Sequence, residues 1–154
     1  MTDPDQTPVN AFISYATRDN TLARRLVDLL RVHGQIHPRY RISFWFWDDD
    51  TVPGLPVRQF EDELKARAVI VQLLSPAWLT STAVREIELP ASATKIQIPL
   101  GLLAVPLAGV GLQIWRLNNE TWFGDLAGSP NKQNEWAMKA VDAIAGRLDY
   151  EGWR

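Results

Sequence analysis

The sequence predicts an α/β fold in which helices cover both faces of a central parallel sheet. Short apolar runs rich in strand-forming residues alternate along the chain with stretches whose apolar residues recur at helical spacing. Several of the strand-like runs are apolar throughout, which is typical of strands covered on both faces. The chain has 154 residues, 46% of them hydrophobic, which is enough for one domain with its own core. Alternating strands and helices within one such domain favour a three-layer arrangement.

The first predicted strand and helix occupy the start of the chain. Residues 9–15 are a short apolar run of strand-forming residues. From Thr21 onward, leucines recur at helical spacing with charged residues between them. Asp19 or Asn20 is a suitable N-cap for this helix, and Gly34 is a suitable end.

The second predicted strand, residues 41–47, is rich in aromatic residues. Because side chains alternate along a strand, Phe44 and Phe46 face one side of the sheet, and Trp45 and Trp47 face the other. We expect Trp45 to be a core residue. Trp47 ends the strand, and it suits the core and a cleft equally well.

The remaining elements complete a flavodoxin-like three-layer sandwich of about five strands. Further strands are expected at residues 68–75, 95–105 and 111–118, and further helices at 57–66, after Ser75-Pro76 and at 135–148. Ser-Pro is a helix-start signature because proline suits the first helical position. Ligands bind such sheets beyond the carboxyl ends of the strands, here the loops after Tyr15, Trp47, Ser75 and Val105.

One domain, residues 9–150, accounts for most of the chain, between a disordered lead at 1–8 and a tail at 151–154. The start of the chain is polar and acidic, unlike a signal peptide. The most apolar stretch, 96–110, is interrupted by proline and glycine and is shorter than the roughly 20 residues of a membrane helix. We therefore expect a cytoplasmic protein that does not enter a membrane.

Composition excludes several kinds of chemistry. Lys and Arg number 16 and Asp and Glu 18, so the basic surface of a nucleic-acid-binding domain is missing. The chain has no cysteine, hence no disulfide, thiolate nucleophile or cysteine-ligated metal. Its two histidines, His33 and His37, flank the expected helix end, which favours a loop role over a catalytic triad. Arg24, Arg25 and Arg31 are expected to form a solvated helix face.

Four short motifs follow one another along the chain. They are Phe12-Ile13-Ser14-Tyr15 with Arg18-Asp19; Asp48 with Pro53-Gly54; Leu74-Ser75-Pro76-Ala77-Trp78-Leu79 with Ser81 and Glu88-Leu89-Pro90; and Ile98-Pro99-Leu100. In this order they resemble the successive signatures of Toll/interleukin-1 receptor (TIR) domains. The resemblance extends from about Val9 to Leu148, nearly the whole chain.

The resemblance implies one of two functions. Many TIR domains are scaffolds that recruit other TIR domains, and others, including many bacterial ones, cleave NAD⁺ between nicotinamide and ribose or cyclise it. The enzymes use one glutamate after the third strand, usually followed by Leu and in one bacterial subset by Leu-Pro. Glu88-Leu89-Pro90 matches this pattern better than Glu86-Ile87, so Glu88 is the expected catalytic residue. Residues two apart on a helix do not share a face, so at most one of the two glutamates faces the substrate.

A single carboxylate suffices for this reaction on chemical grounds. Glycosidases generally need a second carboxylate because the leaving oxygen must be protonated. Nicotinamide instead leaves a cationic pyridinium as a neutral molecule, so no general acid is required. A carboxylate near the ribose then stabilises the positive charge that develops in the transition state.

The resemblance, together with position at the carboxyl ends of the predicted strands, indicates which residues contact the substrate. They are Ser14, Tyr15, Ala16, Arg18, Trp47, Asp48, Ser81 and Val84. Arg18 suits both pairing with the diphosphate of NAD⁺ and exposure near a helix start, and Tyr15 equally suits half-buried packing. Trp78 is more simply a core residue, although it or Trp47 could stack on the substrate.

The loop after the second strand is expected to bind a second copy of the domain. In TIR domains this BB loop carries contacts between copies, and here it comprises Asp49, Asp50, Thr51, Val52, Pro53, Gly54 and Leu55. The acidic run Asp48–Asp50 is more simply a solvated turn than a metal site. We expect no metal and no cofactor, with NAD⁺ as the substrate.

One departure from the family favours the non-enzymatic alternative. Enzymatic TIR domains often carry an aromatic residue three to five positions before the glutamate, where this chain has Ala83, Val84 and Arg85.

The first hypothesis is an NAD⁺ hydrolase or cyclase of a prokaryotic immune (anti-phage or abortive-infection) system, activated by self-assembly and served by a fused or separate sensor. The second is a TIR interaction module without activity. A third alternative, an unrelated flavodoxin-like or response-regulator-like domain, would explain the acidic run but not the motifs.

Overall fold

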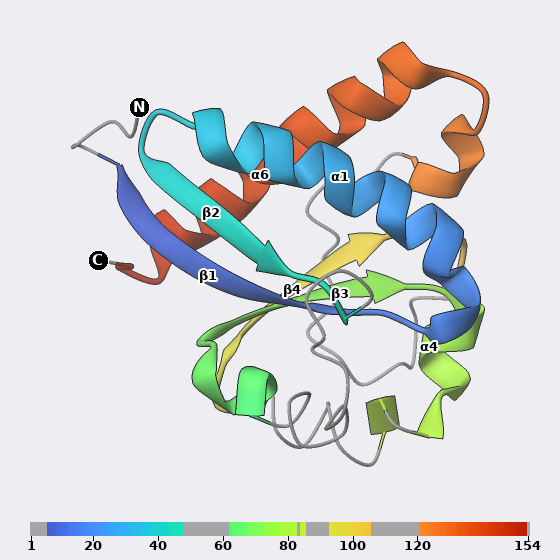
Figure 1. The fold of residues 1–154 in the computed structure, drawn as a ribbon, viewed down its shortest axis with the longest axis horizontal. Helices are drawn as coiled ribbons and strands as arrows, with labels where there is room; N and C mark the ends of the chain where they lie inside the picture. Colours follow the sequence, from blue (N-terminus) through green and yellow to red (C-terminus); the bar gives the residue numbers. More distant parts are fainter. Residues whose placement is uncertain (1–5, 48–61, 83, 86–92, 106–120, 154) are drawn as a thin grey trace.

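The structure, a computed structural model, describes residues 6–47, 62–82, 84–85, 93–105 and 121–153. Its elements, shown in Figure 1, are β1 (Thr7–Ser14), η1 (Thr17–Asp19), α1 (Asn20–Ile36), β2 (Tyr40–Trp45), β3 (Val69–Leu74), α4 (Pro76–Thr80), β4 (Ile96–Gly101), η3 (Phe123–Leu126) and α6 (Pro130–Tyr150). Residues 62–66 are also helical. The predicted α/β class is confirmed.

The strands in the described ranges form one parallel sheet in the order β2-β1-β3-β4. The chain begins in the middle of the sheet with β1, adds β2 on one side, and then continues on the other side with β3 and β4. The direction in which strands are added therefore reverses between β1 and β3, as in flavodoxin-like sheets. The predicted fifth strand, 111–118, lies outside the described residues.

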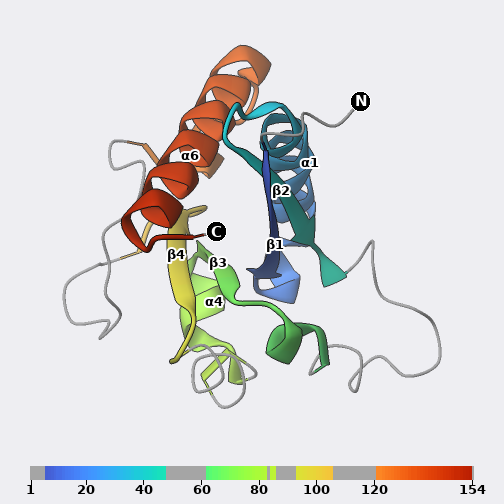
Figure 2. The ribbon, with the colours of Figure 1, turned by 90° about the vertical axis from the view of Figure 1, so that its left-hand side faces the viewer.

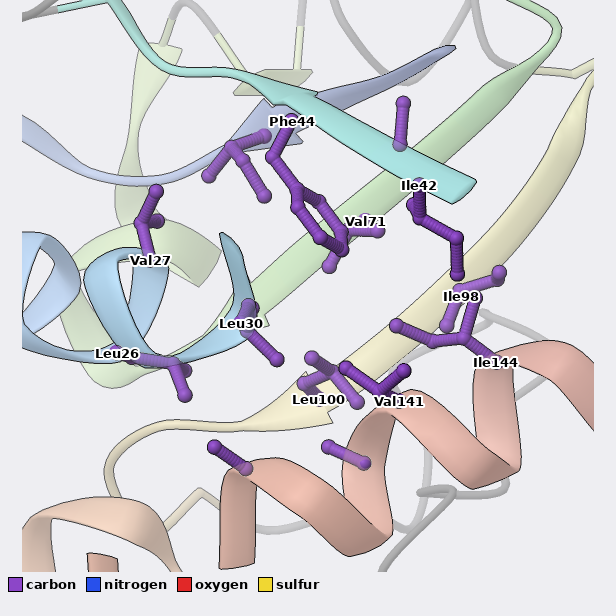
Figure 3. Close-up of a cluster of buried hydrophobic side chains, with 14 of the residues drawn as sticks. Leu26, Val27, Leu30, Ile42, Phe44, Val71, Ile98, Leu100, Val141 and Ile144 are labelled. Atoms are coloured by element: carbon purple, nitrogen blue, oxygen red, sulfur yellow. The ribbon is translucent and has the colours of Figure 1, made fainter. Parts of the chain in front are cut away.

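One face of the sheet is covered by α1 and α6, which lie side by side in Figures 1 and 2. Figure 3 shows the side chains that meet between these helices and the strands, among them Leu26, Leu30, Ile42, Val71, Leu100, Val141 and Ile144. All of these are 0–1% exposed. Full burial of one such side chain contributes about 1.5–3 kcal/mol, so this layer, the largest buried cluster among the described residues, contributes substantially to stability.

The opposite face of the sheet carries a smaller aromatic cluster. Phe12 of β1 lies opposite Trp45 of β2, and their rings stack with centroids 5.1 Å apart. Ile70 of β3 and Leu64 of the helical residues 62–66 complete the buried cluster. Phe44 is part of the first face, so the predicted alternation along β2 and the core role of Trp45 are confirmed.

Helix α1 continues past Gly34 to Ile36, although the sequence predicts that the helix ends at this glycine. At Gly34 the helix crosses β2 so closely that a Cβ atom would lie 2.7 Å from the carbonyl oxygen of Ile42 and 3.0 Å from the Phe44 ring. Glycine is therefore required for the approach of helix to strand. It does not end the helix.

Two other boundaries lie earlier in the chain than predicted. β1 begins at Thr7, which pairs with Tyr40 of β2 inside the stretch expected to be disordered. α6 begins at Pro130 rather than at residue 135. Its first turn is polar and so gives no apolar period, although Ser129-Pro130 is itself a helix-start signature. No helix in the described ranges is both long and apolar enough to span a membrane.

The two ends of the described chain meet where the strands of the sheet begin. The Gln6 side-chain amide donates to the carbonyl oxygens of Gln35 (3.1 Å) and His37 (2.7 Å). Trp153 packs against the main core, and its indole nitrogen donates to the carbonyl oxygen of Pro8 (3.4 Å). Residues expected to form a tail therefore contact the first strand.

Candidate functional site

A pocket of about 330 Å³ lies beyond the carboxyl ends of β1 and β3. One wall consists of Ala16, Thr17 and Arg18, which follow β1, and the other of Ala77, Thr80 and Ser81, which belong to α4 or follow it. The direction of strand addition reverses between β1 and β3. In open parallel sheets, ligands bind at this reversal. Two of the predicted loops, those after Tyr15 and Ser75, thus come together here.

The walls of the pocket offer one cation and several hydroxyl groups. Arg18 is the only charged side chain among the described residues that line it, and Thr17, Thr80 and Ser81 carry the hydroxyls. The Thr80 hydroxyl donates to the carbonyl oxygen of Pro76 (3.0 Å), which leaves its oxygen lone pairs as acceptors. A pocket lined by one arginine and three hydroxyl-bearing residues suits a phosphate or diphosphate group.

Three of the predicted contact residues, Ala16, Arg18 and Ser81, line this pocket. Thr17 and Thr80 were not predicted. Thr17 lies between two predicted residues, and Thr80 lies three positions after Ala77 on the same side of a helix, so both could have been inferred from their neighbours.

A buried chain of hydrogen bonds lies next to the pocket. The Trp78 indole nitrogen donates to the Ser14 hydroxyl (2.9 Å), and the Trp78 backbone N–H donates to the Ser75 hydroxyl (3.0 Å). Ser75 in turn donates its hydroxyl hydrogen to the Asp19 carboxylate. Ser14, Ser75 and Trp78 are at most 1% exposed, so the Ser14 hydroxyl is turned into the protein and the core role of Trp78 is confirmed.

Three further predicted contact residues do not line the pocket. Tyr15 is half-buried, and the centre of its ring lies 4.7 Å from that of the Phe46 ring. This is the half-buried packing that was the alternative to substrate contact. Trp47 lies edge-on to Trp45 on the other face of the sheet, with ring centroids 6.1 Å apart. Val84 is buried in a cluster with Leu74, Trp78 and Val105, to which Ala16 also belongs.

Several predicted residues lie outside the part of the chain that the structure describes. They are the catalytic candidate Glu88 with Glu86, the strand-end residue Asp48, the BB-loop residues 49–55, and Ala83. Their roles remain predictions. Arg85 is described, is exposed, and donates its backbone N–H to the Ser81 carbonyl oxygen (3.1 Å).

The arginines of α1 are not simply solvated, which corrects the prediction. The Arg24 guanidinium lies 5.6 Å from the centre of the Phe46 ring, within cation–π range. Arg31 donates to the carbonyl oxygen of Phe44 (3.0 Å) at the edge of the sheet, and exposed Arg25 donates to Gln133 (3.2 Å). These contacts fasten α1 to β2 and α6.

His37 is a structural residue at the amino end of the sheet, consistent with the expected loop role. Its Nδ1 accepts the backbone N–H groups of Arg39 (3.1 Å) and Tyr40 (3.3 Å). Burial lowers the pKa of His37, and the nearby Arg39 lowers this pKa further. His33, by contrast, lies within α1 and contacts the Asn134 side chain (2.9 Å).

An ionisable cluster beside His37 joins β2 to α6. The Tyr40 hydroxyl and the Arg39 guanidinium both donate to the Asp149 carboxylate, at 2.6 and 2.7 Å. Burial and then this hydrogen bond raise the pKa of Tyr40 to about 12. The same bond holds the pKa of Asp149 below its ordinary value.

Comparison with known proteins does not assign a family to the chain. No model of a protein family matches the sequence. No curated protein matches it either. Within the described ranges, no three His, Cys, Asp or Glu side chains are grouped so as to hold a metal ion.

Proposed function

We propose that this protein is an NAD⁺-cleaving enzyme of the TIR type that breaks the bond between nicotinamide and ribose. The observation that carries the proposal is the pocket between the β1–α1 loop and α4. Its walls come from the first and third TIR-like motifs, which include Arg18 and Ser81. Residues of two motifs that lie about 60 positions apart in the sequence thus line one pocket, at the position in a parallel sheet where ligands bind.

The proposed reaction uses the pocket for binding and Glu88 for chemistry. Arg18 pairs with the diphosphate of NAD⁺. The bond from the ribose C1 to the pyridinium nitrogen breaks, and its electron pair goes to nicotinamide. The Glu88 carboxylate stabilises the resulting positive charge on the ribose. A water oxygen then bonds to C1 and releases one proton to solvent, giving ADP-ribose; an internal nucleophile in place of water gives a cyclic product.

The wider role follows from the TIR resemblance. The BB loop, residues 49–55, binds a neighbouring copy, and self-assembly activates the enzyme. The protein acts in the cytoplasm of a prokaryote as part of an immune response, with a fused or separate sensor that drives assembly. NAD⁺ is its substrate, and it needs no cofactor.

The proposal is tested by chromatography of NAD⁺ incubated with the purified protein, both free and clustered on beads. We expect nicotinamide release from the clustered protein. Glu88→Gln should abolish release, because it removes the charge with little change of shape. Glu86→Gln is the matched control and should retain activity. Loss of activity in Glu86→Gln alone would reassign the catalytic glutamate.

A second candidate function is a TIR interaction module without catalysis. It is favoured by the position of Val84, which is buried in the cluster with Trp78, and by Arg85, which is exposed. Neither residue supplies the aromatic face that enzymatic members often carry before the glutamate. Reversible self-association in sedimentation experiments, with no nicotinamide release from the assembled protein, would support this function.

A further inference from the structure

The two walls of the pocket come from distant parts of the chain. One wall, Ala16–Arg18, is followed directly by Asp19, and the other wall begins two residues after Ser75. Asp19 and Ser75 are 56 residues apart in the sequence, and a hydrogen bond joins their side chains. This bond links the chain segments from which the two walls arise.

The bond lies in a buried setting in which each group has a defined role. Ser75 is fully buried and donates its only hydroxyl hydrogen to Asp19, which is 9% exposed. The Ser75 oxygen accepts the backbone N–H of Trp78, and the Trp78 indole reaches back to Ser14 at the end of β1. The hydrogen-bonded chain therefore begins and ends on the segment that forms the first wall.

Loss of the carboxylate would affect both walls. Hydrogen bonds to an ionised acceptor are about twice as strong as neutral ones, and a buried donor without a partner is costly. The first wall is a short turn: η1 is three residues long, and the Asp19 N–H bond to the Ala16 carbonyl oxygen (2.9 Å) closes it, so a change at Asp19 acts directly on this turn. An unpaired Ser75 hydroxyl would also disturb the start of α4.

We infer that Asp19 and Ser75 are positioning residues that hold the walls of the pocket, and so Arg18 and Ser81, in one arrangement for the substrate. This inference rests on the proposed function and adds to it. Neither residue lines the pocket, so neither touches the substrate. Because they act on the pocket walls, their loss weakens substrate binding and changes the chemical step little.

The kinetic test separates binding from chemistry. Asp19→Ala should raise the KM for NAD⁺ about tenfold and change kcat less than about twofold, the pattern of lost uniform binding. Asp19→Asn keeps an oxygen that accepts from Ser75 but loses the charge, so its KM should rise about threefold. Tyr40→Phe, which removes a hydrogen bond to Asp149 at the other end of the sheet, should leave KM unchanged. An unchanged KM in Asp19→Ala overturns the inference, and so does an unchanged KM in Asp19→Asn if the alanine variant does not fold.

A second readout does not depend on activity. In NMR spectra, Asp19→Asn should shift the backbone amides of both walls, residues 16–18 and 77–81, and the indole N–H of Trp78. Shifts confined to the first wall would overturn the inference. If the wild-type protein releases no nicotinamide, the proposed function fails, and the amide shifts still decide whether Asp19 positions both walls.

Discussion

Gly34 of α1 and Gly146 of α6 are both helical but have different surroundings. A Cβ atom at Gly34 would meet the backbone oxygen of Ile42, which belongs to a paired strand. A Cβ atom at Gly146 would meet no atom of the described residues within 4 Å. The sequence alone does not distinguish these two glycines, because the difference arises from the crossing of α1 over β2.

Substitution by alanine should therefore have opposite effects at the two positions. Gly34→Ala should lower the free energy of unfolding by about 1–2 kcal/mol, since overpacking exceeds the gain of about 1 kcal/mol in helix propensity. Gly146→Ala should raise the free energy of unfolding by about 0.5–1 kcal/mol. Urea denaturation of both variants measures this. An increase in stability for Gly34→Ala would contradict the close approach of α1 to β2.

At the scale of elements, α4 and α6 begin with the same dipeptide but differ in how they are capped. Ser75 precedes Pro76 and accepts the backbone N–H of Trp78. Ser129 precedes Pro130, and its side chain makes no capping hydrogen bond. Ser75 is fully buried, whereas Ser129 is partly exposed.

Ser75→Ala should therefore be far more destabilising than Ser129→Ala. The loss of a cap costs about 1 kcal/mol, and loss of the donor to a nearly buried carboxylate adds about 1–3 kcal/mol. Ser129→Ala should change the free energy of unfolding by less than about 0.5 kcal/mol, as is usual at surface positions. Thermal and urea unfolding of the pair would show this, and equal effects would mean that Ser75 does not connect α4 to Asp19.

The helices and strands show how much of the fold the sequence patterns predict. Apolar periodicity located all four described strands and both long helices to within a few residues, because burial of one face or both determines those patterns. The polar first turn of α6 carries no such pattern and was missed. For the site, the TIR-like motifs contain Arg18 and Ser81, and the place of Ala16 at the end of the first strand indicated that residue. Ser14 and Val84 face the interior because of contacts with residues distant in the sequence, and the spacing of neighbouring residues does not predict such contacts.

At the scale of the whole molecule, the cluster around His37 joins segments that are far apart in the chain. Tyr40, at the start of β2, is bonded to Asp149, near the end of α6. His37 fixes the turn before β2 and is faced by Arg39, Asp142 and Asp149. The turn before β2 thus depends on the neutral form of His37, and the bond from β2 to α6 depends on the ionised form of Asp149.

Acidification should lower the stability of the protein through these two groups in two steps. Burial and Arg39 hold the pKa of His37 below its ordinary value of 6.5, so the unfolded chain binds a proton first. Stability from His37 is therefore present above pH 6.5 and declines as the pH falls below it. Because the Tyr40 bond lowers the pKa of Asp149 below 3.8, a second loss follows at lower pH.

The first step can be isolated with His37→Asn. Asparagine retains an acceptor for the backbone N–H groups of Arg39 and Tyr40 but does not titrate. Urea denaturation at pH 7.5 and 5.5 should show a larger loss of stability on acidification in the wild-type protein than in this variant. Parallel pH profiles would refute the role of His37.

The hydrogen bond between Trp153 and Pro8 almost closes the described chain into a ring, and this has a practical consequence for attaching the protein to surfaces. Both ends of the described chain lie at the amino ends of the strands. The pocket lies at the carboxyl ends, roughly 25 Å away along the eight-residue strand β1. In Figure 1 the start of β1 and the end of α6 lie on one side and α4 on the other. Attachment near either end of the described chain would therefore leave the pocket facing away from a bead, and the choice of end would not change this.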